Sequence, residues 1–225
     1  MLDRPLYSLP DVAHLLHVHP DTLRYWVRGK TYPAKGGGET TIPPLVGDGE
    51  GLLSFQDLAE LAVVAHLRHL GFRLSALRET AADIEAATRM PRPFLTKLLA
   101  GGASELALDV DKGKPISMTY PGQRVLPLPV DDIFRRIEFD PDRLVVRVRP
   151  FSRPEDPLHD PIRIEIDPRR RFGRPITRPN GLDVAAIWDR CQWGETAEEL
   201  TEDLRAEPEE IEEAIRYQRR YLEAA

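Results

Sequence analysis

The sequence contains one cysteine, no long apolar run and no excess of positive charge, and each absence excludes a class of protein. Cys191 alone cannot form an internal disulfide, which excludes a disulfide-stapled fold and favours a reducing compartment. The longest apolar runs, such as Leu61–Leu67, are far shorter than the roughly 20 residues that span a bilayer. The first residues lack the basic start and apolar stretch of a secretory signal. We therefore expect a cytoplasmic protein.

The chain does contain enough material for two modest domains. Of its 225 residues, 41% are hydrophobic and 30% are charged, so it can bury real cores and differs from a disordered tail. The 21 prolines cluster between Pro115 and Pro179. This clustering predicts a middle region that is rich in loops.

The net charge of −6 is distributed unevenly. Residues 183–225 carry 5 basic and 13 acidic side chains, whereas residues 106–182 carry 15 basic and 12 acidic ones. Within residues 19–35, four cations stand against Asp21 alone. A local basic face is sufficient to bind nucleic acid, whereas an acidic tail repels phosphates. We expect the tail to contact protein and not DNA.

Hydrophobic spacing predicts a mainly α protein with a small β region, in three parts. Residues 1–100 indicate four helices around a glycine-rich stretch at 30–53, which predicts a hairpin or long loop. Residues 103–168 form a small α+β linker domain with one helix near 130–137. Its four apolar runs predict the strands of a short central sheet: Leu106–Val110, Ile116–Tyr120, Leu144–Val148 and Ile162–Ile166. Residues 169–225 form a three-helix domain, with Thr196–Glu199 as a capping box.

Two short helices near the N-terminus, the second of them basic, predict a helix-turn-helix. With Leu23, Trp26 and Val27 facing inward, the second helix presents polar side chains that suit DNA. Together with two lysines of a following wing, the candidate DNA-binding residues are His19, Thr22, Arg24, Tyr25, Arg28, Lys30 and Lys35. An arginine can bond guanine or phosphate through two N–H groups, and a tyrosine hydroxyl can reach the backbone. The alternative is a solvated helix pair whose cations only maintain solubility.

The residues of this region resemble a known family. The stretch from Tyr7 through Ala13 and the run Thr22-Leu23-Arg24-Tyr25-Trp26 are similar to the opening of MerR-type winged helix-turn-helix domains. The resemblance covers residues 6–80 and includes Ser54-Phe55 at the start of the helix after the wing. It implies DNA binding. The wing is longer, at Lys30–Leu53, and no long helix leads to a cysteine-bearing effector loop, so metal or drug sensing is not implied.

A second resemblance covers residues 165–221. The stretch Ile166–Ile176 and the acidic helices after it are similar to the bacterial family called domain of unknown function 433. The matching positions are Gly173, Pro175, Val184, Ile187, Gly194, Thr196, Glu198, Glu199, Leu200, Ile211, Ala214, Ile215 and Tyr217. The bridge Arg178-Pro179-Asn180-Gly181 replaces a more usual Gly-Thr-Arg. Physically, the last helix begins Pro208-Glu209-Glu210, and so acidic an exposed start does not suit a groove lined by phosphates.

A MerR-like head joined to this tail resembles antitoxins of VapB type. The resemblance implies two partners, a PIN-domain ribonuclease toxin of VapC type and promoter DNA of the protein's own operon. It also implies a homodimer or a hetero-oligomer with toxin. Such toxins hold Mg²⁺ with carboxylates, and antitoxins of this type often place an arginine there. The candidate toxin-binding residues are Arg169, Arg170, Arg171, Arg174 and Arg178. The alternative is that these arginines solvate a loop or pair with the acidic tail.

The sequence predicts no enzyme, no metal site and no cofactor. His14 and His17 share a helix face but lack a further ligand nearby, so we expect surface or phosphate-contacting imidazoles. His66 lies on a helix that we expect to be packed. Cys191 has no identifiable base, and no Walker loop, Gly-x-Ser-x-Gly elbow or His-Glu-x-x-His occurs. Two alternatives stay open: a stand-alone MerR-like regulator whose central sheet binds a small ligand, and an interaction adaptor that never touches DNA.

Overall fold

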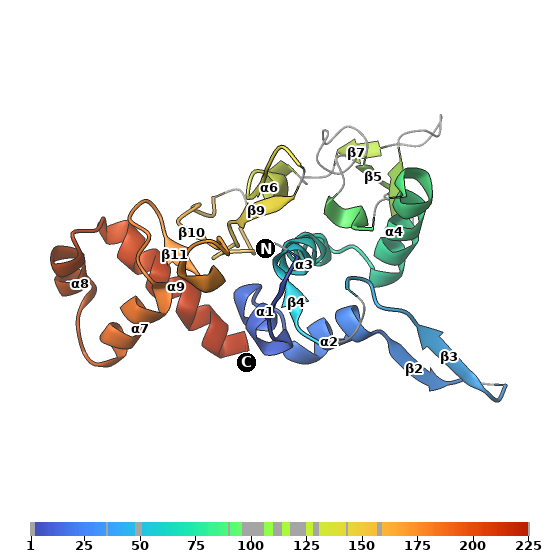
Figure 1. Ribbon diagram of the computed structural model, residues 1–225, viewed down its shortest axis with the longest axis horizontal. Coiled ribbons are helices and arrows are strands. Elements are labelled where there is room, and N and C mark those ends of the chain that lie inside the picture. The colour runs from blue at the N-terminus through green and yellow to red at the C-terminus, as the bar shows by residue number, and fades with distance from the viewer. Residues whose placement is uncertain are drawn as a thin grey trace.

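The computed structural model of the chain describes residues 3–34, 36–47, 51–89, 91–95, 106–109, 114–117, 125–127, 131–142, 144–156 and 159–224. Helices dominate these residues, and the strands form small antiparallel sheets (Figure 1). The predicted mainly α fold with a small β region is confirmed. None of the helices in these ranges combines the length and the apolar content needed to cross a lipid bilayer.

The first part of the chain folds as a helix-turn-helix followed by a hairpin and two longer helices. Its elements are β1 (Pro5–Tyr7), α1 (Leu9–Leu15), α2 (Pro20–Arg28), β2 (Lys30–Pro33), β3 (Glu39–Ile42), β4 (Leu53–Ser54), α3 (Phe55–His69) and α4 (Leu74–Thr88). Ser8 and Ser54 each exchange hydrogen bonds with an aspartate three residues later, Asp11 and Asp57 respectively. These two capping boxes determine where α1 and α3 begin.

The glycine-rich stretch 30–53 contains the predicted hairpin. β2 and β3 pair in antiparallel register from Lys30 opposite Ile42, and Gly37 and Gly38 take positive φ values near the turn. The hairpin projects away from the body of the molecule (Figure 1). Its strand side chains are almost all exposed. The hairpin therefore has the form of a wing beside the helix-turn-helix.

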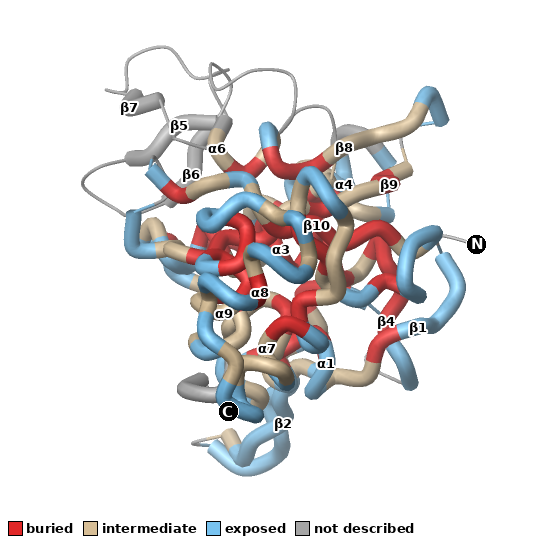
Figure 2. Tube along the Cα trace, turned by 90° about the vertical axis from the view of Figure 1, so that its left-hand side faces the viewer, coloured by how far each residue is buried: buried red, intermediate tan, exposed pale blue. Residues whose placement is uncertain are grey.

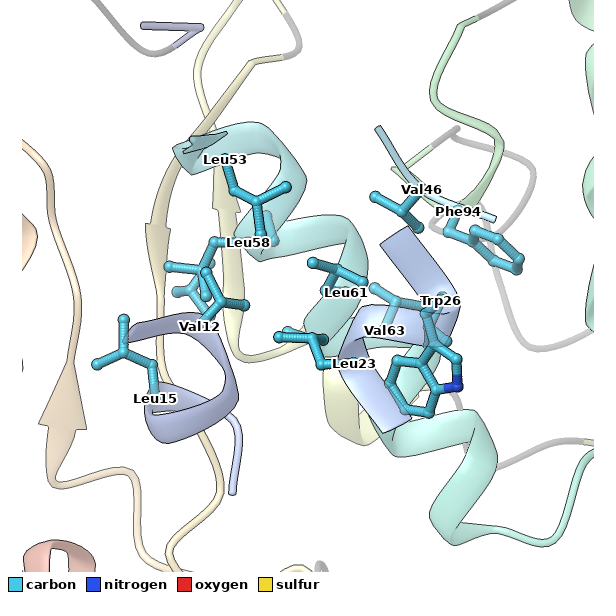
Figure 3. Close-up of a cluster of buried hydrophobic side chains, with 14 of the residues drawn as sticks. Val12, Leu15, Leu23, Trp26, Val46, Leu53, Leu58, Leu61, Val63 and Phe94 are labelled. Carbon is cyan, nitrogen blue, oxygen red and sulfur yellow. The ribbon is translucent and has the colours of Figure 1, made fainter. Parts of the chain in front are cut away.

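α3 carries the largest hydrophobic core and lies near the centre of the molecule (Figure 2). Its side chains Leu58, Leu61 and Val63 are fully buried, and Leu23 and Trp26 of α2 lie beside them (Figure 3). The same core continues into later parts of the chain through Ile133, Val145, Val148 and Ile166. Apolar burial contributes about 25 cal/mol per Å². The buried face of α2, with Leu23 and Trp26, therefore determines which face of the helix points to solvent.

The middle of the chain contains short elements. They are η1 (Pro93–Leu95), β5 (Leu106–Asp109), β6 (Lys114–Ser117), β7 (Val125–Pro127), α6 (Asp131–Phe134), β8 (Ile137–Phe139), β9 (Val145–Val148), β10 (Ile164–Glu165), η2 (Arg171–Gly173) and β11 (Ile176–Thr177). β6, β5 and β7 form one sheet, β8 and β9 a second, and β10 and β11 a third. The four predicted runs do overlap strands. The first two runs pair with each other as β5 and β6, whereas β9 pairs with β8 and β10 pairs with β11, two strands that the alternation of side chains had not revealed.

Three helices form the C-terminal unit, as predicted: α7 (Val184–Gln192), α8 (Ala197–Leu204) and α9 (Pro208–Ala224). Thr196 and Glu199 make the expected capping box at the start of α8. A second core joins these helices to β10 through Ile164, Val184, Ile187, Leu200, Ile211, Ala214 and Tyr217. α9 runs from this core toward α1, so the C-terminus lies near the helix-turn-helix (Figure 1).

Candidate functional site

α2 has one buried face and one exposed face. Leu23 and Trp26 are buried in the core, whereas Thr22, Arg24 and Arg28 are exposed on the other side. Arg24 forms an ion pair with an aspartate one turn earlier, but about half of its side chain stays accessible. The side chain of Arg28 has no hydrogen-bond or ion-pair partner among the described residues. The helix can therefore present two guanidinium groups to a ligand.

The remaining candidate DNA-binding residues surround this face. His19 is exposed and caps α2, because its Nδ1 accepts a hydrogen bond from the backbone N–H of Asp21 at 3.2 Å. Lys30 is exposed at the start of β2. Tyr25 is only half-buried. Lys35 lies outside the described residues.

Arg78 of α4 is a polar neighbour of this face that the sequence analysis missed. Its guanidinium carbon lies 5.0 Å from the centre of the Tyr25 ring, a cation–π distance. Its Nη2 donates a hydrogen bond of 3.4 Å to the carbonyl oxygen of Pro43, just after the wing. Arg78 thus connects α4, α2 and the end of the wing. Only the fold brings these three residues together, and no local sequence signal could have found them.

The junction between α2 and the wing requires glycine. Gly29 ends α2 with φ 68°, and a Cβ there would collide with the carbonyl oxygen of Ile42. Glycine alone adopts this conformation without a steric penalty. The backbone N–H of Leu45 donates to the carbonyl oxygen of Trp26 at 2.7 Å and fastens the returning chain to α2. The wing is therefore fixed relative to α2 at both of its ends.

Three of the five candidate toxin-binding arginines are bound to buried carboxylates of this chain. Arg169 donates from Nε and Nη2 to Asp167 at 2.9 and 2.8 Å. Arg170 donates to Glu165 at 2.9 Å, and Arg178 lies 3.5 Å from the same carboxylate. Burial alone raises the pKa of Asp167, but the hydrogen bonds from Arg169 hold it below its usual value. These three arginines stabilise the loop that carries them.

The other two arginines point elsewhere. Arg171 and Arg174 are exposed, and their side chains have no hydrogen-bond or ion-pair partner among the described residues. Between them, Phe172 is 86% exposed. The loop therefore displays two unpaired cations around an aromatic ring.

The acidic last helix is less exposed than its sequence indicated. Glu210 is fully buried, where it accepts hydrogen bonds from Thr177 and from Asn180. Glu213 is buried beside Arg153 at 3.4 Å. The expectation of an exposed acidic start was wrong for Glu210, and Glu213 further along the helix is buried as well, because both carboxylates form contacts within the chain. Other carboxylates, such as Glu209 and Glu212, remain exposed and keep the outer face acidic.

His17 is also placed differently from the expectation. Its ring meets that of Tyr217 edge-on, with centroids 4.6 Å apart, and both ring nitrogens are shielded from solvent. Burial lowers the pKa of His17 to about 3, and burial lowers that of His14 to about 4. A surface or phosphate-contacting role for His17 was therefore wrong. His66 is buried against Phe151, as expected.

Within the described ranges, no group of three or more His, Cys, Asp or Glu side chains has an arrangement that could hold a metal ion. Cys191 is half-buried and packs against the core of the C-terminal unit.

Comparison with known families agrees with both sequence resemblances. Residues 7–84 match the family described as MerR HTH family regulatory protein, and residues 164–218 match the family described as Protein of unknown function (DUF433). The chain thus carries a segment similar to the MerR family near its start and a segment similar to DUF433 near its end. Both motif-based identifications are confirmed.

One curated relative aligns with the chain over nearly its whole length. The chain is 24% identical over 231 residues to a candidate antitoxin, VapB45, of Mycobacterium tuberculosis, covering 95% of this chain and 93% of the relative. The expected resemblance to VapB-type antitoxins is confirmed by this likeness. The fold is also similar to the crystal structure of Rv2018 from Mycobacterium tuberculosis, with a TM-score of 0.65 and 20% identity. That likeness covers 95% of this chain and 99% of the other.

Proposed function

We propose that this protein is an antitoxin with two binding activities. It represses its own operon by binding promoter DNA, and it binds and silences a PIN-domain ribonuclease toxin of VapC type. The observation that carries the proposal is one chain in which a MerR-type recognition helix exposes Arg24 and Arg28 while a separate loop exposes Arg171 and Arg174. The likeness to a candidate antitoxin over 95% of the chain supports it.

In the DNA-binding step, α2 enters the major groove and the wing follows the adjacent backbone. Thr22, Arg24 and Arg28 lie on the exposed face that would meet base edges and phosphates. Lys30, and Lys35 further along the wing, supply cations for phosphates. The ring of Tyr25, held by Arg78, would present its hydroxyl at the edge of this face. DNA binding of this kind is strongly weakened by salt.

In the toxin-binding step, the arginine loop contacts the carboxylates with which the toxin holds Mg²⁺. An arginine fork suits this task, because it can donate two parallel hydrogen bonds to one carboxylate. Arg169, Arg170 and Arg178 hold the loop in place through Asp167 and Glu165. Arg171 and Arg174 have no such contact with the residues that the structure describes and are the ones that we expect to reach a partner.

The chain needs neither a catalytic group nor a cofactor for these activities, since the chemistry belongs to the toxin. We propose that it acts as a homodimer or as a hetero-oligomer with toxin, because operators of helix-turn-helix proteins pair two half-sites. Light scattering after size exclusion, with and without the toxin, measures this stoichiometry.

The proposal is tested by co-expression with the adjacent open reading frame and by a gel shift on the protein's own upstream DNA. An antitoxin rescues growth from a toxic neighbour, co-purifies with it and retards the upstream fragment. Retardation without rescue would indicate a stand-alone regulator instead. Rescue without retardation would indicate an adaptor that does not bind DNA.

A further inference from the structure

Phe172 is held in an unusual position. Its ring is 86% exposed, although phenylalanine is normally buried. Its backbone is left-handed, with φ 56°, as are those of its neighbours Arg171 at 48° and Gly173 at 74°. Left-handed backbone is unfavourable for residues that carry a Cβ, and such strain concentrates at binding sites. In the described part of the chain, no packing contact explains why an aromatic ring is displayed there.

The loop is anchored on both sides of this ring. On one side, Asp167 accepts hydrogen bonds from the backbone and side chain of Arg169, and Glu165 accepts one from Arg170. On the other side, the hydroxyl of Tyr7 donates to the carbonyl oxygen of Gly173 at 3.2 Å. Because the loop is already fixed, its exposed side chains lose little further entropy on binding.

We propose that Arg171, Phe172 and Arg174 form an anchor that docks into an apolar pocket rimmed by carboxylates on a partner protein. The inference rests on the proposed function, in which the partner is the toxin, and it adds the ring of Phe172 as the central contact. Aromatic and arginine side chains are the residues enriched in the cores of protein interfaces. The rim of the pocket is expected to carry carboxylates, because the guanidinium groups of Arg171 and Arg174 flank the ring and have no partner among the described residues.

A protein suits this anchor better than a nucleic acid does. The helical unit that follows the loop, residues 183–225, carries 5 basic and 13 acidic side chains, and would approach the same ligand. A phosphate backbone would be repelled by that unit. An apolar pocket would take up the ring of Phe172, whereas two arginines alone would be sufficient for phosphates.

The experiment measures binding of the purified full-length chain to the product of the adjacent gene by titration calorimetry. We expect Phe172→Ala to raise the dissociation constant at least tenfold, which is the loss of affinity typical for truncation of a central interface residue. Arg171→Ala with Arg174→Ala has a similar effect and flattens the dependence on salt. Trp193→Ala is the matched control, because Trp193 is an aromatic residue that is 82% exposed in the helical unit after the loop. Arg205→Ala is a control for the arginine variant, because Arg205 is also exposed and also has a left-handed backbone, with φ 51°. Both controls change the constant less than twofold.

Phe172→Gly separates binding from folding. Glycine suits φ 56°, so this variant keeps or raises the melting temperature while it binds as weakly as Phe172→Ala. If the wild-type chain binds the partner and all loop variants bind equally well, the inference is overturned and the proposed function stands. If the wild-type chain does not bind, both are overturned. If the arginine variant weakens only the DNA gel shift, the loop is a nucleic-acid contact and the inference is wrong.

Discussion

The hydroxyl of Tyr217 donates a hydrogen bond to the carbonyl oxygen of Leu15, with 2.7 Å between the two oxygens. This contact joins the last helix, α9, to the first helix of the helix-turn-helix across 202 residues of sequence. Tyr217 is fully buried, and burial raises the pKa of its hydroxyl far above the usual value. The tail thus packs directly on the head, so that the two proposed binding activities share one folded body.

Removal of this hydroxyl should destabilise the whole chain. Tyr217→Phe leaves the carbonyl of Leu15, at the end of α1, without its buried donor, which costs about 1–3 kcal/mol of unfolding free energy. Chemical denaturation measures the loss. Tyr32→Phe is the control, because Tyr32 is 40% exposed on the wing. Equal stability of the two variants would mean that the head and tail do not depend on this contact.

A second long-range contact joins α3 to β9. The side-chain amide of Gln56 donates to the carbonyl oxygen of Val145 at 2.8 Å and accepts from its N–H at 3.0 Å. Gln56→Leu leaves both buried backbone groups unpaired, so we expect a loss of about 2–4 kcal/mol in the unfolding free energy. Gln192→Leu, at an exposed glutamine of α7, should change stability by less than about 0.5 kcal/mol. A loss no larger than in this control would contradict the account.

Gly29→Ala should impair DNA binding through the wing. The new Cβ would meet the carbonyl oxygen of Ile42, so the junction between α2 and the wing must shift. We expect at least a tenfold loss of DNA affinity in fluorescence anisotropy, equivalent to about 1.4 kcal/mol. Gly37→Ala is the matched control: φ is also positive, at 87°, but nothing lies within 4 Å of its Cβ. DNA binding that is equally strong in both variants would show that the wing's position is irrelevant.

The stability of the chain should depend on pH through His17. Burial lowers its pKa from 6.5 to about 3, with Arg220 and His14 adding to the shift and Glu155 opposing it. Between these values the unfolded chain binds more protons, so His17 causes stability to fall as the pH falls from 6.5 toward 3. Buried Glu60, whose pKa is raised to about 7, acts in the opposite direction between pH 4.5 and 7.

A variant isolates the contribution of His17 from that of Glu60. His17→Asn suits the left-handed backbone at φ 52° and removes the imidazole. Denaturation at pH 7, 6 and 5 should show that the wild-type chain loses stability relative to this variant, by up to about 1.4 kcal/mol per pH unit. A stability difference that stays constant with pH would mean that His17 titrates normally in the folded chain.

Local signals allowed much of the fold to be predicted from sequence. Ser54 and Thr196 begin helices at the predicted residues, because a capping box involves only residues three apart. Leu23 and Trp26 face inward as expected, because helical periodicity determines which side chains share a face. The same periodicity also predicted which residues of α2 are exposed.

Contacts between distant residues could not be predicted in this way. Four strands were visible as apolar runs, but their pairing depends on the tertiary fold, which places them in three sheets and gives β9 and β10 partners, β8 and β11, that the sequence had not indicated. Similarly, the sequence presented five equivalent arginines between 169 and 178. The positions of Glu165 and Asp167 distinguish Arg171 and Arg174 as the two without a partner among the residues that the structure describes.

The most direct test of the account is the double variant Arg24→Ala with Arg28→Ala, measured for upstream DNA affinity and for rescue from the toxin. We expect the loss of DNA binding and a salt dependence reduced by about two ions, because two exposed cations are removed. Binding to the toxin and rescue of growth should remain intact. Loss of both activities together, or of neither, would contradict the assignment of DNA to the α2 face and of the toxin to the tail.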